Sequence, residues 1–282
     1  MNIINELFRS NNIVYHYTKI QTAYEHILDL DRIKLSERKT SNDPIENITI
    51  PNISTSFYGY EKTKYAETEL IDKVREFILN KTKNAKQSCF CLNDLNPEFD
   101  NAEVVPFKYY GFLKPRMWEQ YGDNYNGICL AFDLEKLKEK NKSIYSKQVK
   151  YIDYELFHSN SKNIDTVNLH NKGIEKYCHE YYEIIKRQSL LKHLDYSGEN
   201  EYRFISFTEN EKFISIKDCL KAIVISERNI SPFAREWVNT YAEKNNIELF
   251  FISWYDTGFG LMSKKESDDM SKWVKDSIIS KR

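Results

Sequence analysis

The sequence contains few glycines and prolines, 8 and 6 in 282 residues, and it has no long apolar run. The low glycine and proline content argues against a fibrous or disordered chain. No apolar run approaches the roughly 20 residues that a membrane-spanning helix needs. The first residues, MNIINELFRSNN, lack the basic and apolar regions of a signal peptide. We therefore expect a folded cytoplasmic protein that has no membrane partner.

Net charge is also small, at −1, which indicates no bulk attraction to nucleic acid. One local exception is the lysine-rich segment Lys136–Lys150, which fits either a solvated helix and turn or a nucleic-acid patch. The five cysteines are an odd number in a chain without an export signal, so we expect reduced thiols. Cys89 and Cys91 are two residues apart, and no second pair at metal-binding spacing follows them. We therefore predict no metal site.

Aromatic residues are plentiful at 14%, with 20 Tyr and 16 Phe, which suits clefts as well as cores. Periodicity predicts strands and helices that alternate along the whole chain. The expected strands are residues 13–17, 32–36, 48–57, 87–92, 127–133, 148–152, 201–207, 212–216, 221–226 and 247–254. The expected helices are 18–30, 61–80, 115–122, 172–191, 231–246 and 270–279. Thr18 and Ser231 are the expected N-caps of the first and fifth of these helices, and Pro115 is expected to start the third. In the fifth helix, spacing places Phe233, Trp237, Val238 and Tyr241 on one face. This order predicts one α+β domain over residues 1–282, with helical insertions at about 61–83 and 153–195.

Strong catalytic motifs are missing, since the chain has no glycine-rich phosphate loop, no paired metal motif and no nucleophile elbow. What remains is a set of polar residues at strand edges. His16 lies at the centre of the first strand, where it is either a half-buried core histidine or a ligand. Glu201 and Arg203 point the same way on a strand. They form either a surface ion pair, worth ~0–1 kcal/mol, or the mouth of a cleft.

Several stretches follow each other in a characteristic order. They are YHYTKI (15–20), AYEHIL (23–28), SNDPIE (41–46), SCFCLND (88–94), MWEQYGDNYNGICLAFD (117–133), VKYIDY (149–154) and YSGENEYRF (196–204). This succession resembles the DUF2971 family, a bacterial group of unassigned function. The resemblance covers residues 13–207, and its most specific block is 89–133. The family implies no chemistry by itself.

A second, weaker resemblance does imply chemistry. A YHYT strand followed by a helix is similar to the opening of the ADP-ribosyltransferase superfamily, which includes poly-ADP-ribose polymerases and DNA-targeting toxins of the DarT kind. That superfamily then has a Ser-Thr-Ser strand and a late strand-edge Glu. The chain has His16, Ser54–Ser56 and Glu199–Glu201 in that order. The resemblance implies a split mixed β-sheet and an enzyme that consumes NAD to modify a nucleic-acid or protein target, as a toxin or phage-defence effector does.

The same resemblance implies roles for individual residues. Glu201 is the catalytic carboxylate, which stabilises the oxocarbenium-like state formed when the nicotinamide–ribose bond of NAD breaks. His16 is catalytic and binds NAD, and Glu199 orients the acceptor. Further NAD-binding candidates are Tyr17 and Arg116, together with Phe90 or Tyr121 as the ring that stacks on nicotinamide. We expect Trp118 to be structural.

One departure weakens this second resemblance, because a Ser-Thr-Ser strand is normally partnered by Arg rather than by His. Two alternatives to an enzyme stay open. One is a non-catalytic module that binds a nucleotide or a nucleic acid. The other is a structural interaction protein whose aromatic residues form its core.

Overall fold

The computed structural model describes residues 8–38, 55–56, 68–95, 109–153, 164–227, 230–255 and 258–269. These residues group into two compact units, each assembled from separate segments of the chain. Unit 1 comprises the described residues within Met1–Ile33, Phe90–Lys142 and Ser215–Arg282, and unit 2 those within Lys34–Cys89 and Ser143–Ile214. Each unit has its own hydrophobic core. The single-domain organisation stays a prediction.

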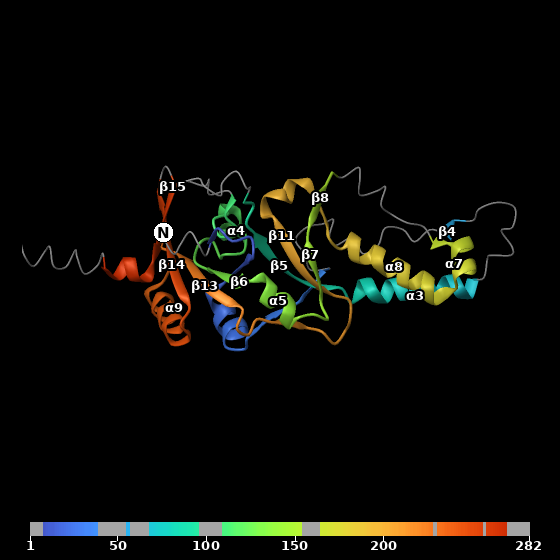
Figure 1. The fold of residues 1–282 in the computed structure, drawn as a ribbon, viewed down its shortest axis with the longest axis horizontal. Helices are drawn as coiled ribbons and strands as arrows, with labels where there is room; N and C mark the ends of the chain where they lie inside the picture. Colours follow the sequence, from blue (N-terminus) through green and yellow to red (C-terminus); the bar gives the residue numbers. More distant parts are fainter. Residues whose placement is uncertain are drawn as a thin grey trace, which may run out of the picture. The chain divides into compact units, whose positions relative to one another are not determined.

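Unit 1 is built on a mixed sheet with the strand order β15-β14-β13-β6-β1-β5 (Figure 1). The strands are β1 (Ile13–Thr18), β5 (Lys86–Leu92), β6 (Ile128–Asp133), β13 (Leu220–Ser226), β14 (Glu248–Tyr255) and β15 (Gly258–Ser263). The last three residues of β5 belong to this unit. β13 and β14 run parallel, whereas the other neighbours are antiparallel. In β6 every residue before Asp133 is buried, as expected of a central strand covered on both faces.

The helices of unit 1 agree with the sequence prediction at some of their ends and differ from it at others. They are α2 (Ile20–Thr22), the π-helix η1 (Ala23–Leu28), α4 (Pro115–Gln120), α5 (Leu134–Lys140), α9 (Pro232–Asn245) and a further helix at 264–269. The predicted cap of α9 is confirmed, because Ser231 Oγ accepts a hydrogen bond from Ala234 N at 3.2 Å. Two details were wrong. Phe233 is 81% exposed instead of facing the core, and Thr18 ends β1 while Lys19 takes the N-cap position of α2.

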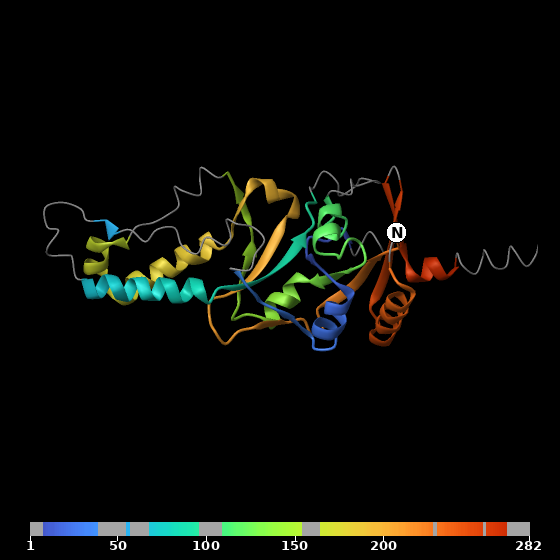
Figure 2. The same cartoon turned by 180° about the vertical axis from the view of Figure 1, so that it is seen from behind.

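Unit 2 consists of short strands and a pair of long helices. The strands are β3 (Ser36–Glu37), β4 (Thr55–Ser56), β7 (Tyr145–Gln148), β8 (Lys150–Ile152), β9 (Ile164–Asp165), β10 (Leu191–His193) and β11 (Glu201–Ser206). The helices are α3 (Thr68–Lys83), α7 (Thr166–Lys172), α8 (Ile174–Gln188) and the 3-10 helix η5 (Leu194–Glu199). β2 (Arg32–Lys34) and β12 (Phe213–Ser215) are each divided between the units. Figure 2 shows α3 and α8 side by side, as does Figure 1.

Strand pairing in unit 2 is local. β11 pairs antiparallel with β7, β10 pairs parallel with β8, β4 pairs parallel with β9, and β3 pairs antiparallel with the first residues of β5. The strand expected at 148–152 is interrupted at Val149, so its two parts, β7 and β8, pair with different partners. The lysine-rich segment forms α5, a turn and β7, and most of its lysines are exposed.

The α+β class with a mixed sheet is confirmed, while the ADP-ribosyltransferase-like split of that sheet stays a prediction. The turn expected at 41–46, the first seven residues of the strand at 48–57 and the helix at 270–279 lie outside the described residues.

Candidate functional site

Four charged side chains of unit 2 are almost completely buried and contact one another. They are Lys192, Glu199, Glu201 and Arg203, and we call them the ionic quartet; none of these side chains is more than 7% exposed. Lys192 is the central residue of β10, Glu199 is the last residue of η5, and β11 carries the other two. Chain geometry brings them together, because η5 joins β10 to β11 in only a few residues.

The turn between the two glutamates fixes their directions. Asn200 lies between them in the left-handed region, with φ 44° and ψ 64°, a conformation that asparagine adopts more readily than most residues. The turn ends η5, and β11 starts at the next residue. The backbone N–H of Glu201 donates to the Tyr151 hydroxyl at 2.9 Å. Tyr151 lies on β8, opposite Lys192 in the register of β10.

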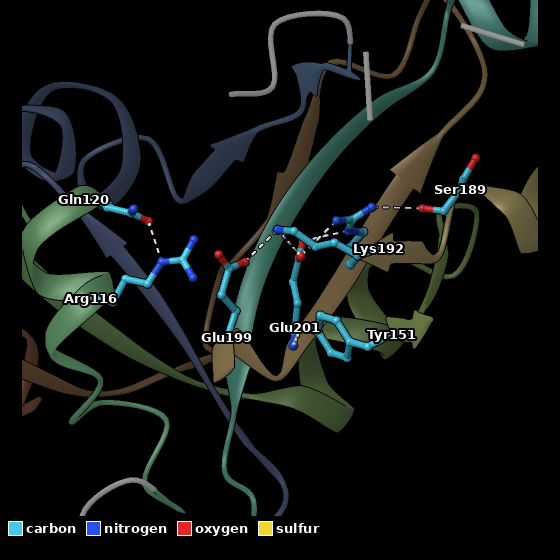
Figure 3. Close-up of polar contacts among 8 residues, drawn as sticks. Arg116, Gln120, Tyr151, Ser189, Lys192, Glu199 and Glu201 are labelled. Carbon is cyan, nitrogen blue, oxygen red and sulfur yellow. Dashed lines mark hydrogen bonds and ion pairs between the residues drawn. The ribbon is translucent and has the colours of Figure 1, made fainter. Parts of the chain in front are cut away.

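The quartet contains two ion pairs joined by the lysine (Figure 3). Arg203 Nε donates to Glu201 Oε1 at 2.6 Å, and Arg203 Nη2 donates to Glu201 Oε2 at 2.9 Å. Lys192 Nζ donates to Glu199 Oε2 at 2.6 Å and to Glu201 Oε2 at 3.2 Å. Two positive and two negative charges balance, which is the condition under which charged groups can be buried.

Arg203 is also held from the opposite side. Its Nη1 donates to the carbonyl oxygen of Ser189 at 3.0 Å, at the C-terminal end of α8. A cation at this end of a helix interacts favourably with the helix dipole. The guanidinium is therefore fixed by both a carboxylate and a helix terminus.

The electrostatic environment keeps Glu201 ionised. Burial by itself raises the pKa of Glu201. The charge of Arg203 and its hydrogen bonds, with smaller contributions from Lys192 and the Cys89 thiol, outweigh burial and lower the pKa to about 2. Burial, followed by the negative charge of Glu201, raises the pKa of Tyr151 well above its ordinary value. At neutral pH the site therefore presents a carboxylate beside a neutral phenol.

Two expectations about these residues need correction. Glu201 and Arg203 do share one face of β11, as predicted, but they are not a surface ion pair: their side chains are 4% and 0% exposed. Both faces of β11 are buried, so no face of this strand is left in solvent. The position of Glu199 directly after Gly198, before the strand, predicts a turn of variable position, yet Glu199 is buried and paired with Lys192.

The sequence-predicted residues on β1 lie in unit 1. His16 is half-buried, opposite Leu130 of β6, and its ring centre is 5.3 Å from that of Phe90. Phe90 itself is 1% exposed, which leaves no open ring face for stacking on nicotinamide. Tyr17 is a core residue whose hydroxyl donates to the carbonyl oxygen of Gly111 at 2.7 Å.

The residues around α4 differ from one another in burial. Arg116 is exposed, and its Nε donates to Gln120 Oε1 at 3.3 Å, one turn along the helix (Figure 3). Tyr121 is 41% exposed at the C-terminal end of the helix. Trp118 is structural, as predicted: it is fully buried and its Nε1 donates to the carbonyl oxygen of Phe112 at 2.8 Å.

Some of the expected combinations of residues join different units. His16 and Arg116 belong to unit 1, and Glu201 to unit 2. Their convergence on one pocket stays a prediction. Thr55 and Ser56 of the Ser-Thr-Ser stretch form β4, and Ser54 lies outside the described residues.

Sequence reasoning missed Lys192, Tyr151 and the contact of Cys89 with Glu201. One signal was available for the lysine, since it lies between leucines in the stretch LLKHL, residues 190–194. A lysine in such a run is buried only when it is paired. Nothing in the sequence indicated which carboxylate would pair with it.

The fold and the quartet define an α+β chain with a buried ionic site. Residues 117–204 match the model of a family described as protein of unknown function, DUF2971. That range contains the whole quartet and Tyr151, but it excludes His16, Tyr17, Phe90 and Arg116. No curated protein and no solved structure matches the chain.

Metal ligands and membrane-spanning helices are the last features of the described residues that bear on partners. Among these residues, no group of three or more His, Cys, Asp or Glu side chains is arranged to hold a metal ion. No helix in the same ranges has the length and apolarity required to span a bilayer.

Proposed function

We propose that the chain is an ADP-ribosyltransferase-like enzyme that cleaves NAD and transfers ADP-ribose to a nucleic-acid or protein target, in the role of a toxin or phage-defence effector. Glu201 is the catalytic carboxylate. The observation that carries the proposal is the environment of this side chain, which is ionised, rigidly held and located at the first residue of a strand.

The chemistry requires such a carboxylate. When the bond between C1′ of the ribose and the nicotinamide nitrogen breaks, the electron pair leaves with nicotinamide and positive charge develops on the ribose. A fixed negative charge stabilises that state without reorganisation. The acceptor then forms a bond to C1′ and passes its proton to water. Glu199, which is separated from Glu201 by Asn200 alone, is proposed to orient the acceptor.

NAD reaches Glu201 only if one of the donors that surround its carboxylate is displaced. A carboxylate has about four acceptor positions. Three are taken by nitrogen donors of Arg203 and Lys192, and the thiol of Cys89 provides a fourth donor. A thiol is the weakest donor of the set, and Cys89 is half-exposed. We therefore propose that a ribose hydroxyl of NAD displaces the thiol from Glu201.

The same saturation of Glu201 favours a second function. If Arg203 and Lys192 hold the carboxylate for structural reasons only, the chain is a non-catalytic module that binds a nucleotide or a nucleic acid. The two functions differ in one measurable event, which is the release of nicotinamide.

The test incubates the full chain with NAD that carries a label in nicotinamide and measures the label released. We expect Glu201→Gln to lower the rate of release at least ~100-fold, the usual cost of losing one electrostatic stabiliser of a transition state. Glu199→Gln should spare cleavage and weaken transfer to the acceptor. The matched control is Glu180→Gln, which makes the same chemical change at an exposed ion pair of α8. It should behave as wild type.

Because Glu201→Gln leaves Arg203 buried without its carboxylate, loss of activity has to be separated from loss of folding. The double variant E201Q/R203M removes both partners and restores charge balance. A folded double variant that still releases nicotinamide contradicts the catalytic assignment. Calorimetric binding of NAD by wild type without any nicotinamide release establishes the binding module in its place.

A further inference from the structure

Three lysines and three aromatic rings of unit 2 alternate in space. They form a series that we call the lysine–aromatic ladder: Phe77 and Lys81 on α3, Tyr182 and Lys186 on α8, and Tyr145 and Lys147 on β7. Lys81 Nζ lies 5.8 Å from the ring centre of Phe77 and 5.2 Å from that of Tyr182. Lys186 Nζ lies 4.4 Å from the ring centre of Tyr182 and 5.5 Å from that of Tyr145.

The ladder follows from sequence spacing. Lys81 comes four residues after Phe77, and Lys186 comes four residues after Tyr182, so each pair shares one face of its helix. Lys147 comes two residues after Tyr145 on a strand, which also places the pair on one face. Its Nζ is 5.8 Å from that ring centre.

The rings of the ladder are held in place by their neighbours. Tyr182 meets Phe77 edge to face at 6.5 Å and Phe207 edge to face at 5.4 Å, both at 83°. Since Lys81 and Lys186 share the ring of Tyr182, their amino groups are no more than about 10 Å apart. The three rings are therefore held in fixed positions, and the lysine amino groups are spaced along them.

Cations outnumber carboxylates among the charged groups that act on the rings of the ladder. Arg187 adds to the three lysines through its interaction with Tyr145, while Glu183 and Glu211 act on Tyr182. Glu183 also pairs with Lys186 at 2.7 Å. Among the groups named here, four cations stand against two carboxylates, on a protein whose net charge is −1.

We propose that the lysine–aromatic ladder binds single-stranded nucleic acid. The lysines contact phosphates, and the rings that they uncover accept unpaired bases by stacking, which is the combination typical of single-strand binding surfaces. The bases of a duplex are stacked on one another inside the helix, so they cannot stack on these rings. This inference rests on the proposed function only in naming the target of transfer, because binding does not require NAD.

The experiment measures binding of the full chain to a fluorescein-labelled single-stranded DNA of about 16 nucleotides, the upper size of a single-strand site. Fluorescence anisotropy at several salt concentrations gives the slope of log K against log salt. Each phosphate contact on a single strand contributes ~0.7 to that slope. The triple variant K81Q/K147Q/K186Q should therefore lose about 2 from the slope.

The matched control is K73Q/K172Q/K176Q, which removes the same charge from lysines elsewhere on α3, α7 and α8. Its slope should equal that of wild type. Tyr182→Leu keeps an apolar side chain against Phe77 and should weaken binding about tenfold with no change in slope. An unlabelled duplex of the same sequence should compete poorly.

Three results would overturn the proposal: no binding by wild type, an equal loss in both triple variants, or competition by the duplex as strong as by the single strand. Nicotinamide release by the ladder variant without added DNA tests the proposed function separately. If the chain binds DNA through the ladder but leaves NAD intact, the ladder inference holds and the proposed enzyme activity is wrong. If the chain cleaves NAD but does not bind DNA, the enzyme activity holds and the ladder inference is wrong.

Discussion

Breaking one ion pair of the quartet should cost more stability when one partner is removed than when both are. In Glu201→Gln the amide cannot balance the charge of Arg203, whose side chain is 0% exposed and donates to both oxygens of Glu201 in wild type. Removing one partner of a buried ion pair costs ~3–5 kcal/mol. That is a large part of a total stability of about 5–15 kcal/mol.

The double variant E201Q/R203M removes the isolated charge as well. Methionine fills part of the volume of the arginine stem, and Lys192 keeps its partner Glu199 at 2.6 Å. Replacing both members of a buried pair by uncharged groups is often neutral. We expect the double variant to lie within about 2 kcal/mol of wild type, and therefore to be more stable than Glu201→Gln alone.

Urea unfolding at neutral pH, followed by circular dichroism, measures these differences as shifts of the transition midpoint at constant slope. Glu180→Gln is the control for the charge change itself, because its surface ion pair is worth at most about 1 kcal/mol. The reasoning is refuted if the double variant is as unstable as the single variant or less stable than it. That result would mean that Arg203 is stabilised by contacts other than Glu201.

Two further predictions concern acid and the core of unit 1. Because the folded pKa of Glu201 is lowered from 4.5 to about 2, its contribution is complete above the unfolded value and is lost as pH falls from about 5 to about 2. The stability of wild type relative to E201Q/R203M should fall by about 3 kcal/mol across that window in urea titrations, and a difference independent of pH would contradict it. Trp118→Ala should cost ~3–5 kcal/mol, since the side chain is fully buried and meets Tyr17 edge to face at 5.3 Å; an unchanged urea midpoint would show that the tryptophan is not a core residue.

Local sequence signals were sufficient to predict an element where its stabilising contacts lie between residues close together in the chain. Ser231 caps α9, and Pro115 occupies the first turn of α4, in each case through contacts within a few residues. Strands β1, β5 and β6 were also predicted, because their apolar residues form runs bounded by polar turns. In these elements the sequence pattern and the final structure depend on the same short-range geometry.

Prediction failed where burial depends on distant segments. Helical spacing grouped Phe233 with Val238, yet Phe233 is in the first turn of α9 and is exposed, while Val238 is fully buried. The same limit applies to β11. Alternation placed Glu201 and Arg203 on one face, but it does not specify whether that face meets solvent or another part of the chain.

The ionic quartet shows why a glutamate pair is difficult to interpret from sequence. Two carboxylates near each other suggest a catalytic site, and the resemblance to Glu-x-Glu transferases strengthened that interpretation. Their environment depends on Lys192, which comes from β10 and contacts both. With two cations present, the pair is as suited to holding β10, η5 and β11 together as to catalysis. Cys89 is a half-buried donor to Glu201. Cys89→Ala therefore removes the group that a ribose hydroxyl is proposed to displace.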